Sequence, residues 1–439
     1  MPNPSLLSVL ARSFLSAAPD AREIAARGAH ALGRSWRWLG PLARRCLEAF
    51  ARRPRPRRRD VIEFLRADAG FREAWRKYST EISVARYLQE PQPMQPVAAA
   101  VSWPIPAIET PGALAAWLEL DPGELDWFAD LKSLGYKRNQ PRLRHYHYKV
   151  LLKQSGAVRL IEAPKPRLKQ LQRRILAGIL DSIPLHPAAH GFRRGHSIKT
   201  FVAPHTGQRV VLRMDVRNFF PSIGRARIQA LFRTAGYPET VADLLGGICT
   251  NATPRDVWKH TGSLDPNGIR EARALYAAPH LPQGAPTSPA LANLCAYRMD
   301  CRLAGLAHSA GAVYTRYADD LAFSGGRDFE RSVARFSTLA AAILDEEGFA
   351  VHHRKTRIMR QGVCQHLAGL VANQRVNIPR ADFDRLKATL TNCVRFGIDS
   401  QNRDGHPSFR AHLEGRIAFV EMIHAAKAAR LRALFEQIL

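Results

Sequence analysis

The stretch Val313-Tyr314-Thr315-Arg316-Tyr317-Ala318-Asp319-Asp320-Leu321-Ala322-Phe323-Ser324 decides the fold prediction for this chain. It holds two β-prone runs around a pair of acids, and Gly325-Gly326 closes the second run. This pattern predicts a β-hairpin with the carboxylates of Asp319 and Asp320 at its tip. Adjacent carboxylates repel each other, and oxygen-only ligands favour a hard cation such as Mg²⁺. Taken alone, the same residues fit an ordinary solvated turn equally well, so the interpretation depends on other parts of a phosphoryl-transfer site.

The chain is strongly basic. Its 439 residues include 65 Lys and Arg against 38 Asp and Glu, which gives a formal net charge of +27. This excess suits a polyanionic partner, because basic side chains that meet phosphates release condensed counterions. Nucleic acid is therefore the expected partner, ahead of an acidic membrane surface or a simple gain in solubility. The length predicts roughly two or three domains.

Cysteine spacing and hydropathy exclude several classes of protein. The six cysteines form no C-x-x-C pair, so neither a zinc site nor a disulfide framework is expected. No apolar run approaches the roughly 20 residues that a transmembrane helix needs, so no membrane partner is expected. We therefore expect a cytoplasmic protein. The spaced arginines before Asp20 superficially resemble a transit peptide, but they lack a cleavage pattern and are interpreted as part of a helical extension.

The N-terminal part differs in composition from the rest. Residues 1–90 are rich in Ala, Leu and Arg at helical spacing and predict a basic helical extension. Within it, residues 52–59 hold six arginines and two prolines, which predicts a basic joint that either contacts phosphates or is merely solvated. Residues 91–112 are rich in Pro and Ala and predict an extended linker.

A second hairpin and a basic helix follow this linker. The β-prone runs Tyr146–Leu152 and Ala157–Ile161 bracket Gln154-Ser155-Gly156. Pro164-Lys165-Pro166-Arg167 then leads into an amphipathic helix that carries Lys169 outside its apolar face.

A third carboxylate precedes the acidic hairpin in the sequence. Arg209–Asp215 predicts a buried strand that ends in an acid, and Asn218–Ile223 predicts a turn into a helix. Alone, Asp215 would more often be a helix cap or turn residue than a metal ligand. Three carboxylates on adjacent strand ends, however, can hold two Mg²⁺ ions that activate a 3′- or 2′-hydroxyl and stabilise departing pyrophosphate. Phe220 could then pack under the sugar and exclude a 2′-hydroxyl.

The run Leu281–Pro289 combines a glycine loop with a helix start. Gly284 permits a close backbone approach to a ligand, and Gln283 offers both a donor and an acceptor. Ser288-Pro289 is a helix cap followed by proline at the first helical position. As a lone loop, this run would more often be a structural turn than part of a site.

Three motifs in this order together resemble the palm of reverse transcriptases. They are Met214-Asp215 with Phe219-Phe220, then Leu281-Pro282-Gln283-Gly284, then Tyr317-Ala318-Asp319-Asp320. Each is weak alone, but the joint match is highly specific. Gly191–Ile198, Asp319–Gly325 and the tail from Ser400 resemble the bacterial retron branch, in a longer form with an N-terminal helical extension. The resemblance covers about residues 113–430.

The resemblance implies an α+β right-hand polymerase fold. Fingers would span residues 113–205, a palm with an antiparallel sheet residues 206–375, and a helical thumb residues 376–439, after the extension 1–90 and the linker 91–112.

It also implies roles for individual residues. By motif position, Asp215, Asp319 and Asp320 would be the catalytic acids that bind two Mg²⁺ ions, with Mn²⁺ as the alternative ion. Phe220 would be the sugar gate, and Gln283 with Gly284 would line the incoming nucleotide.

Four basic residues are further candidates for the phosphates of that nucleotide. Arg159, Lys165 and Lys169 could contact the triphosphate, although contact with the template backbone or plain solvation is an equally good interpretation. Lys355 could reach pyrophosphate as an acid, and a duplex phosphate contact is its alternative.

The function that the resemblance implies is RNA-directed DNA synthesis. The enzyme would bind a structured non-coding RNA, prime from an internal 2′-hydroxyl, and use dNTPs to make multicopy single-stranded DNA held as an RNA–DNA hybrid. Anti-phage defence with an effector protein is further implied for this bacterial branch. The alternatives are a group II intron-like or diversity-generating reverse transcriptase, and a reverse-transcriptase-like RNA-binding scaffold without turnover.

Two retron elements depart from the usual pattern. Where retron enzymes typically carry Asn-Ala-x-x-His, this chain has Phe201-Val202-Ala203-Pro204-His205 and keeps only the histidine. Where they carry Val-Thr-Gly, it has Leu367-Ala368-Gly369. The resemblance associates both elements with the cognate RNA, so the type of RNA is left open.

Overall fold

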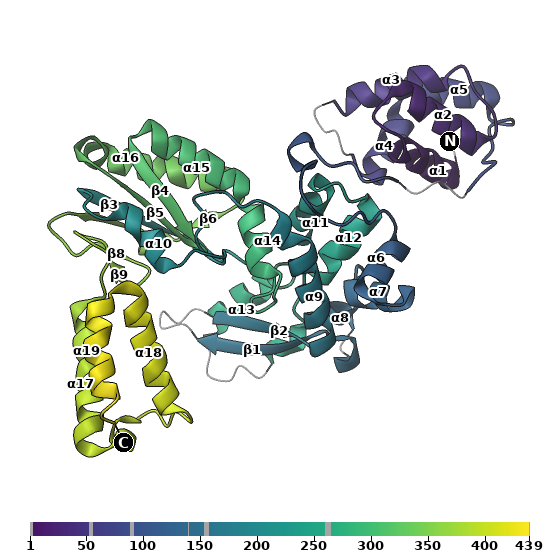
Figure 1. The fold of residues 1–439 in the computed structure, drawn as a ribbon. Helices are drawn as coiled ribbons and strands as arrows, with labels where there is room; N and C mark the ends of the chain where they lie inside the picture. The colour runs from purple at the N-terminus through teal and green to yellow at the C-terminus, as the bar shows by residue number, and fades with distance from the viewer. Residues whose placement is uncertain are drawn as a thin grey trace. The chain divides into compact units, whose positions relative to one another are not determined.

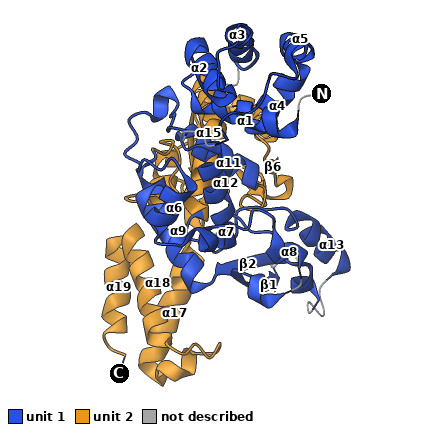
Figure 2. Cartoon of the chain, turned by 90° about the vertical axis from the view of Figure 1, so that its right-hand side faces the viewer, with its two compact units in different colours: residues 1–183, 224–287 blue, residues 184–223, 288–439 orange. Residues whose placement is uncertain are grey.

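A computed structural model describes residues 3–51, 56–87, 92–138, 140–152, 158–259 and 265–438 (Figure 1). The chain forms two compact units, each built from two sequence segments (Figure 2). Unit 1 comprises residues 1–183 and 224–287, and unit 2 comprises residues 184–223 and 288–439.

Unit 1 begins with a bundle of five helices. These are α1 (Pro4–Ser16), α2 (Ala21–Leu32), α3 (Leu39–Ala49), α4 (Arg58–Ala67) and α5 (Ala69–Tyr78). Apolar residues at helical spacing, among them Leu10, Leu42 and Phe71, form its buried core. The helical prediction for this region is therefore confirmed. Of the expected basic joint, residues 52–55 lie outside the described residues.

The rest of unit 1 combines helices with one hairpin. Strands β1 (Tyr146–Leu152) and β2 (Val158–Pro164) pair antiparallel, as predicted, and the turn between them lies outside the described residues. The helices and 3-10 turns are η1 (Ala98–Ala100), α6 (Pro111–Leu118), α7 (Pro122–Ala129), α8 (Leu134–Lys137), η2 (Pro141–Leu143), α9 (Pro166–Gly178), η3 (Leu180–Ser182), α11 (Arg225–Thr234), α12 (Glu239–Ile248), η5 (Arg255–Trp258) and α13 (Pro266–Leu275).

Unit 2 is organised around an antiparallel sheet. Its central path is β4 (Ala312–Tyr317), β5 (Asp320–Gly325) and β3 (Val210–Arg217). The short strands β6 (Ala350–Val351) and β7 (Arg357–Arg360) both pair with β3. The remaining elements before the C-terminal helices are α10 (Ile198–Val202), η4 (Ala203–His205), α14 (Ser288–Cys295), α15 (Tyr297–Ser309), α16 (Arg327–Glu346), η6 (His353–Lys355), β8 (His366–Leu367) and β9 (Leu370–Val371).

Strand β3 is longer than the sequence predicted. We expected it to end at Asp215, but it continues through Val216 and Arg217. These two residues pair with Val351 and Ala350 of β6, which extends the ladder beyond the acid. Asp215 therefore lies within a strand whose backbone is held on both sides.

Strand alternation gives the sheet two different faces. Tyr314, Leu212 and Phe323 share one face, where the Phe323 ring packs against Phe336 of α16. The other face carries Asp215 and Asp320, together with the side chains two and four residues along each strand.

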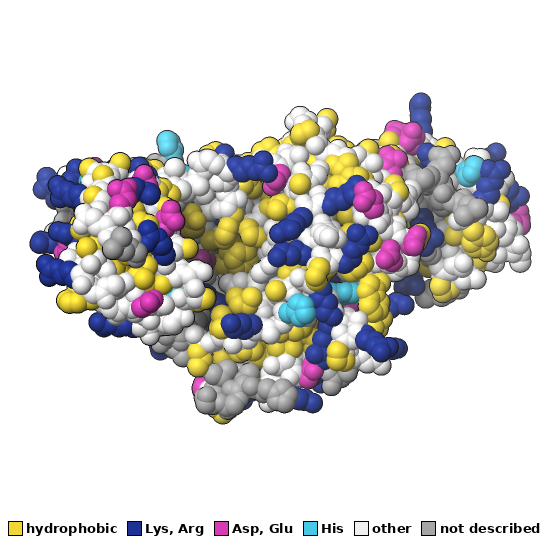
Figure 3. All heavy atoms as spheres, turned by 60° about the horizontal axis from the view of Figure 1, so that its bottom comes forward, with side chains coloured by type: hydrophobic (Ala, Val, Ile, Leu, Met, Phe, Trp, Pro, Cys, Tyr) yellow, Lys and Arg dark blue, Asp and Glu magenta, His cyan; other side chains and the backbone are white. Residues whose placement is uncertain are grey.

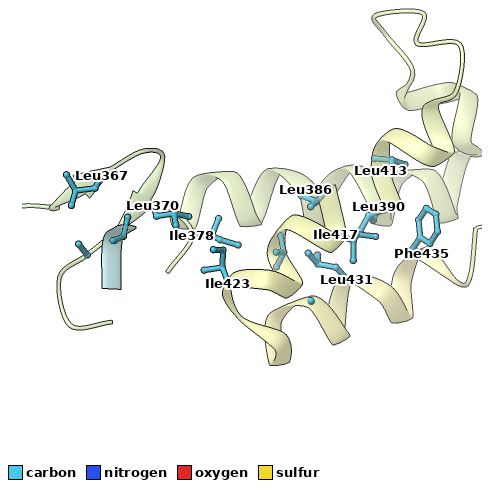
Figure 4. Close-up of a cluster of buried hydrophobic side chains, with 14 of the residues drawn as sticks. Leu367, Leu370, Ile378, Leu386, Leu390, Leu413, Ile417, Ile423, Leu431 and Phe435 are labelled. Atoms are coloured by element: carbon cyan, nitrogen blue, oxygen red, sulfur yellow. The ribbon is translucent and has the colours of Figure 1, made fainter. Parts of the chain in front are cut away.

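Three C-terminal helices pack around a shared apolar core (Figure 4). They are α17 (Arg380–Phe396), α18 (Phe409–Ile423) and α19 (Ala425–Phe435), with η7 (Ile398–Gln401) after the first. The figure shows Leu386 and Leu390 facing Leu413, Ile417 and other apolar side chains of the bundle. These apolar side chains recur at helical spacing, so each helix turns one apolar face to the bundle core. Across the described parts of the chain, no helix has the length and apolar character needed to cross a membrane.

Candidate active site

The three predicted acids lie together in unit 2. Asp215 on β3 is the direct cross-strand partner of Asp320 on β5. The Val216 N–H donates a 2.8 Å hydrogen bond to the backbone carbonyl of Asp319, so the turn of the hairpin is attached to β3 as well. We call β4, the turn Ala318-Asp319 and β5 the acidic hairpin; its predicted form is confirmed.

Two basic side chains hold two of these acids. Arg213 donates from Nε and Nη2 to Asp320 Oδ1, at 2.9 and 2.7 Å. Lys355 Nζ donates to Asp215 Oδ2 at 2.8 Å. Asp215 is buried, whereas the side chain of Lys355 is half exposed. Lys355 was a sequence candidate and lies beside the acids; Arg213 was not identified from the sequence.

The electrostatics favour added positive charge at this point. Burial raises the pKa of Asp319, and the carboxylates of Asp215 and Asp320 raise it further. Burial also raises the pKa of Asp320, and its ion pair with Arg213 opposes that rise only in part. Because clustered carboxylates resist ionisation without a compensating cation, a divalent ion would relieve their repulsion.

The donor set fits a hard divalent cation. Three carboxylates supply only oxygen ligands, which is the chemistry that Mg²⁺ and Mn²⁺ accept. Among the described residues, however, no three His, Cys, Asp or Glu side chains already converge to enclose an ion. Lys355 contacts Oδ2 of Asp215 and Arg213 contacts Oδ1 of Asp320, so these basic side chains lie where they would compete with a cation for the acids.

An aromatic group borders the acids. Phe220 contacts Phe219 and Phe192, with ring centroids 5.7 and 6.2 Å apart, respectively. The Phe192 ring also lies 6.3 Å from that of Tyr317 at the end of β4. Phe192 is half exposed, so this group presents an apolar surface next to the hairpin turn. Phe220 therefore lies in unit 2, as the three acids do, and its role as the sugar gate stays a prediction.

A buried polar network supports the acidic hairpin from the opposite face. Arg316 donates from Nε and Nη2 to the two oxygens of Asp300 on α15, at 2.8 and 2.7 Å, and both side chains are fully buried. Its Nη1 donates to Asn293 Oδ1 and to the carbonyl oxygen of Ala318 in the turn. Ala318 has a φ of 54°, so its backbone needs such support.

Gln283 and Gly284 lie in unit 1, where they contact β2. The N–H of Glu162 donates a 2.9 Å hydrogen bond to the Gln283 carbonyl. Gly284 has a φ of +133°, and a Cβ there would lie 2.9 Å from the Glu162 carbonyl oxygen, so only glycine fits. The predicted close backbone approach is real, but its partner here is the protein's own strand.

Just before this loop in the sequence, His280 forms a buried pair with Glu162. His280 Nε2 lies 2.8 Å from Glu162 Oε2, and Asn251 and Thr253 donate to Glu162 Oε1. Burial alone would lower the pKa of His280, but the Glu162 carboxylate more than offsets it and the pKa is raised. The pair fixes the loop to β2.

The three basic candidates of the fingers also belong to unit 1. Arg159 lies on β2 and is exposed, as is Lys169 on α9. Lys165 is the residue that precedes α9, and its backbone N–H bonds to His145. The structure thus places five site candidates in each unit: the acids, Phe220 and Lys355 in unit 2, and the loop with these three cations in unit 1.

Comparison with known proteins gives the family. Residues 151–380 match the family Reverse transcriptase (RNA-dependent DNA polymerase). Retron Mx65 reverse transcriptase of Myxococcus xanthus is 43% identical over 69% of this chain and 66% of that protein, just under two thirds of its length. Retron Mx162 reverse transcriptase of the same organism is 35% identical over 75% of this chain and 67% of that protein.

Retron Ec86 reverse transcriptase of Escherichia coli is 30% identical, over 62% of this chain and 74% of that protein. The chain belongs to the retron-type reverse transcriptases. This result confirms the resemblance drawn from the ordered motifs, the right-hand α+β fold class and the enzyme class of RNA-directed DNA polymerase. An RNA template is the nucleic-acid partner that this family implies.

Sequence reasoning missed several residues that support the site of this retron-type reverse transcriptase. Arg213 lies two residues before Asp215, so strand alternation puts both on one face, and this signal could have identified it. Gly191 could not be found this way. A Cβ on Gly191 would lie 2.7 Å from the backbone N of Ala318, a contact that only the tertiary fold creates.

Proposed function

We propose that this reverse transcriptase copies part of a structured non-coding RNA into single-stranded DNA, primed from a 2′-hydroxyl of that RNA. The observation that carries the proposal is the meeting of Asp215, Asp319 and Asp320 on adjacent strands. The relatives named as retron reverse transcriptases support the retron form of the reaction. Anti-phage defence with an effector protein is the biological role that we propose with it.

The acids and their neighbours have distinct proposed tasks. Divalent ions bound by the three acids would supply Lewis-acid activation of the attacking hydroxyl and neutralise charge on the phosphates. Lys355 and Arg213 would orient the side chains of Asp215 and Asp320 in this site. Lys355, which lies beside Asp215, would donate a proton to the leaving pyrophosphate.

The other candidates position the nucleotide and the template. Phe220 would exclude a 2′-hydroxyl, and Gln283 with Gly284 would line the incoming dNTP. Arg159, Lys165 and Lys169 would contact the triphosphate. Lys and Arg side chains are spread over the face of the molecule in Figure 3, in keeping with a net charge of +27 and a nucleic-acid partner.

The test is deoxynucleotide incorporation by the purified chain with its co-purifying RNA. The double variant Asp319→Asn with Asp320→Asn should lose product while the RNA stays bound, because charge that holds the metal is removed. Asp345→Asn, an exposed acid on α16, is the matched control and should keep full activity. Equal product from the double variant and the wild type would contradict the proposal.

Sequencing the product and its RNA junction distinguishes the forms of the reaction. Single-stranded DNA joined to an internal 2′-hydroxyl supports the retron form. DNA primed elsewhere would favour a group II intron-like or diversity-generating enzyme instead.

A further inference from the structure

His205 is fully buried in unit 2, at the end of the segment formed by α10 and η4. Its two ring nitrogens contact hydroxyl groups on two neighbouring strands. Nδ1 lies 2.6 Å from Ser324 Oγ on β5, and Nε2 lies 2.7 Å from Thr315 Oγ1 on β4. One side chain therefore connects both strands of the acidic hairpin to the preceding segment.

The direction of each hydrogen bond follows from the available protons. The Thr315 hydroxyl donates to the Phe201 carbonyl at 2.9 Å, so its oxygen accepts from His205 Nε2–H. Burial lowers the pKa of His205 to about 3, so the ring is neutral near pH 7 and Nδ1 is an acceptor. The Ser324 hydroxyl then donates to Nδ1. Each hydroxyl proton and the ring N–H therefore has one defined acceptor.

The hydroxyls lie on the same face of the sheet as the acids. Ser324 and Asp320 are four residues apart on β5, which is about 13 Å along a strand. His205 is thus too distant to touch the reacting atoms and can act only through the hairpin. On the opposite face, Arg316 holds the same hairpin to Asp300.

The segment that carries His205 also reaches the C-terminal helices. Lys199 Nζ donates to the Met422 carbonyl of α18 at 3.0 Å. Phe201 and Val202 are buried in the apolar cluster formed with α17, α18 and α19, and the Phe201 ring lies 5.9 Å from that of Tyr317. The segment therefore links the C-terminal helices to the hairpin.

We infer that His205 is a positioning residue that fixes the acidic hairpin for nucleotide transfer, rather than a contact to the cognate RNA. The resemblance associates its motif with RNA, but a ring without exposed surface cannot touch an RNA while it stays in place. The inference rests on the proposed function, because it assigns His205 a part in that same reaction.

The test compares variants of the full chain with its co-purifying RNA. His205→Ala removes both bonds, and Ser324→Ala with Thr315→Val removes their partners. His308→Ala, an exposed histidine on α15, is the matched control. Three quantities are measured: the dissociation constant for RNA, the maximal incorporation rate per active enzyme with its KM for dNTP, and amide hydrogen exchange in residues 312–325.

The maximal rate per active enzyme should fall by about tenfold or more in His205→Ala, because a displaced hairpin misaligns the acids. The affinity for RNA should stay within about twofold. Exchange in residues 312–325 should accelerate, and the combined triple variant should be no slower than His205→Ala alone, because all three residues act as one unit.

His205→Gln should recover part of the rate, since its amide N–H can take the place of Nε2–H toward Thr315. If His205→Ala does not fold, His205→Gln is compared with the wild type in its place. Weaker RNA binding with a normal rate at saturating RNA would overturn the inference, as would an unchanged rate per active enzyme. Absence of incorporation by the wild type would contradict the proposed function instead, and hydrogen exchange would still test whether His205 fixes the acidic hairpin.

Discussion

At the scale of single residues, two ion pairs lie among the acids of the site. Arg213 on Asp320 and Lys355 on Asp215 place positive charge where divalent ions would bind. These side chains lower the repulsion between acids that lie on adjacent strands. The two basic side chains are partly exposed, whereas Asp215 is buried, so loss of Lys355 would leave the Asp215 carboxylate without its cation.

Phe220 should set the preference for deoxynucleotides. Its ring packs beside Phe219 and Phe192 in the unit that holds the three acids. There it would contact the 2′-hydroxyl of a ribose. Phe220→Ala should raise the kcat/KM ratio of ribonucleotides to deoxynucleotides by about tenfold or more. Competition assays with both substrates measure this ratio. Phe396→Ala, which removes a strongly exposed ring, is the control. An unchanged ratio in Phe220→Ala would show that Phe220 is not the sugar gate.

His205 should make the fold sensitive to acid. Its pKa is about 3 in the folded chain and about 6.5 in the unfolded chain. Between these two pH values, the unfolded chain binds a proton at this histidine and the folded chain does not. The free energy of unfolding should therefore be unaffected by this group above pH 6.5, and should fall by about 1.4 kcal/mol per pH unit below it. His205→Gln should lose this component of the slope in denaturant titrations between pH 6.5 and pH 5. If the free energy of unfolding depends on pH in the same way for the wild type and His205→Gln, the prediction is wrong.

At the scale of elements, the acidic hairpin is held from both faces of the sheet. The Arg316–Asp300 pair connects β4 to α15, and its charges are fully buried. Arg316→Met should lower the free energy of unfolding by about 3–5 kcal/mol, because Asp300 is left buried without its partner. Pairing it with Asp300→Leu should return part of that loss. Denaturant unfolding measures both, and equal stabilities of the single and double variants would show that the stranded charge is not the cause.

Gly191 brings another segment against the turn of the same hairpin. Asn293 Nδ2 donates to the Gly191 carbonyl at 2.8 Å, and a Cβ at this position would meet the backbone N of Ala318 at 2.7 Å. Gly191→Ala should therefore displace the turn and lower nucleotide incorporation by about 10- to 100-fold, with RNA still bound. The control is Gly326→Ala at the other end of β5, where a Cβ meets nothing within 4 Å. Similar rates of nucleotide incorporation by Gly191→Ala and Gly326→Ala would contradict the prediction.

At the scale of the whole molecule, the net charge of +27 should govern RNA binding. Counterion release makes the logarithm of the binding constant fall linearly with the logarithm of salt concentration. A protein with about 6–10 phosphate contacts loses roughly 10³–10⁵ in affinity between 50 and 200 mM salt. Filter-binding titrations of the co-purifying RNA over this range should show such a slope. Nearly constant affinity would mean that phosphate contacts contribute little.

The sequence alone determined the local structure and the identity of the acids. Two β-prone runs around Asp319 and Asp320 predicted the hairpin, and helical spacing in residues 1–90 predicted the N-terminal helices. These features depend on interactions between near neighbours, which a pattern of residue types records. The order of three motifs was enough to identify the family, and the comparisons confirmed it.

Only the tertiary structure decided what surrounds the acids. Arg213 on Asp320, Gly191 against Ala318 and His205 between Ser324 and Thr315 join segments up to 127 residues apart in the sequence. Strand alternation could place Arg213 on the face of Asp215, but no spacing rule reports the contacts themselves, because they depend on strand register and on the packing of whole elements. For the same reason, β3 extends past Asp215: its last two residues pair with a strand more than a hundred positions later.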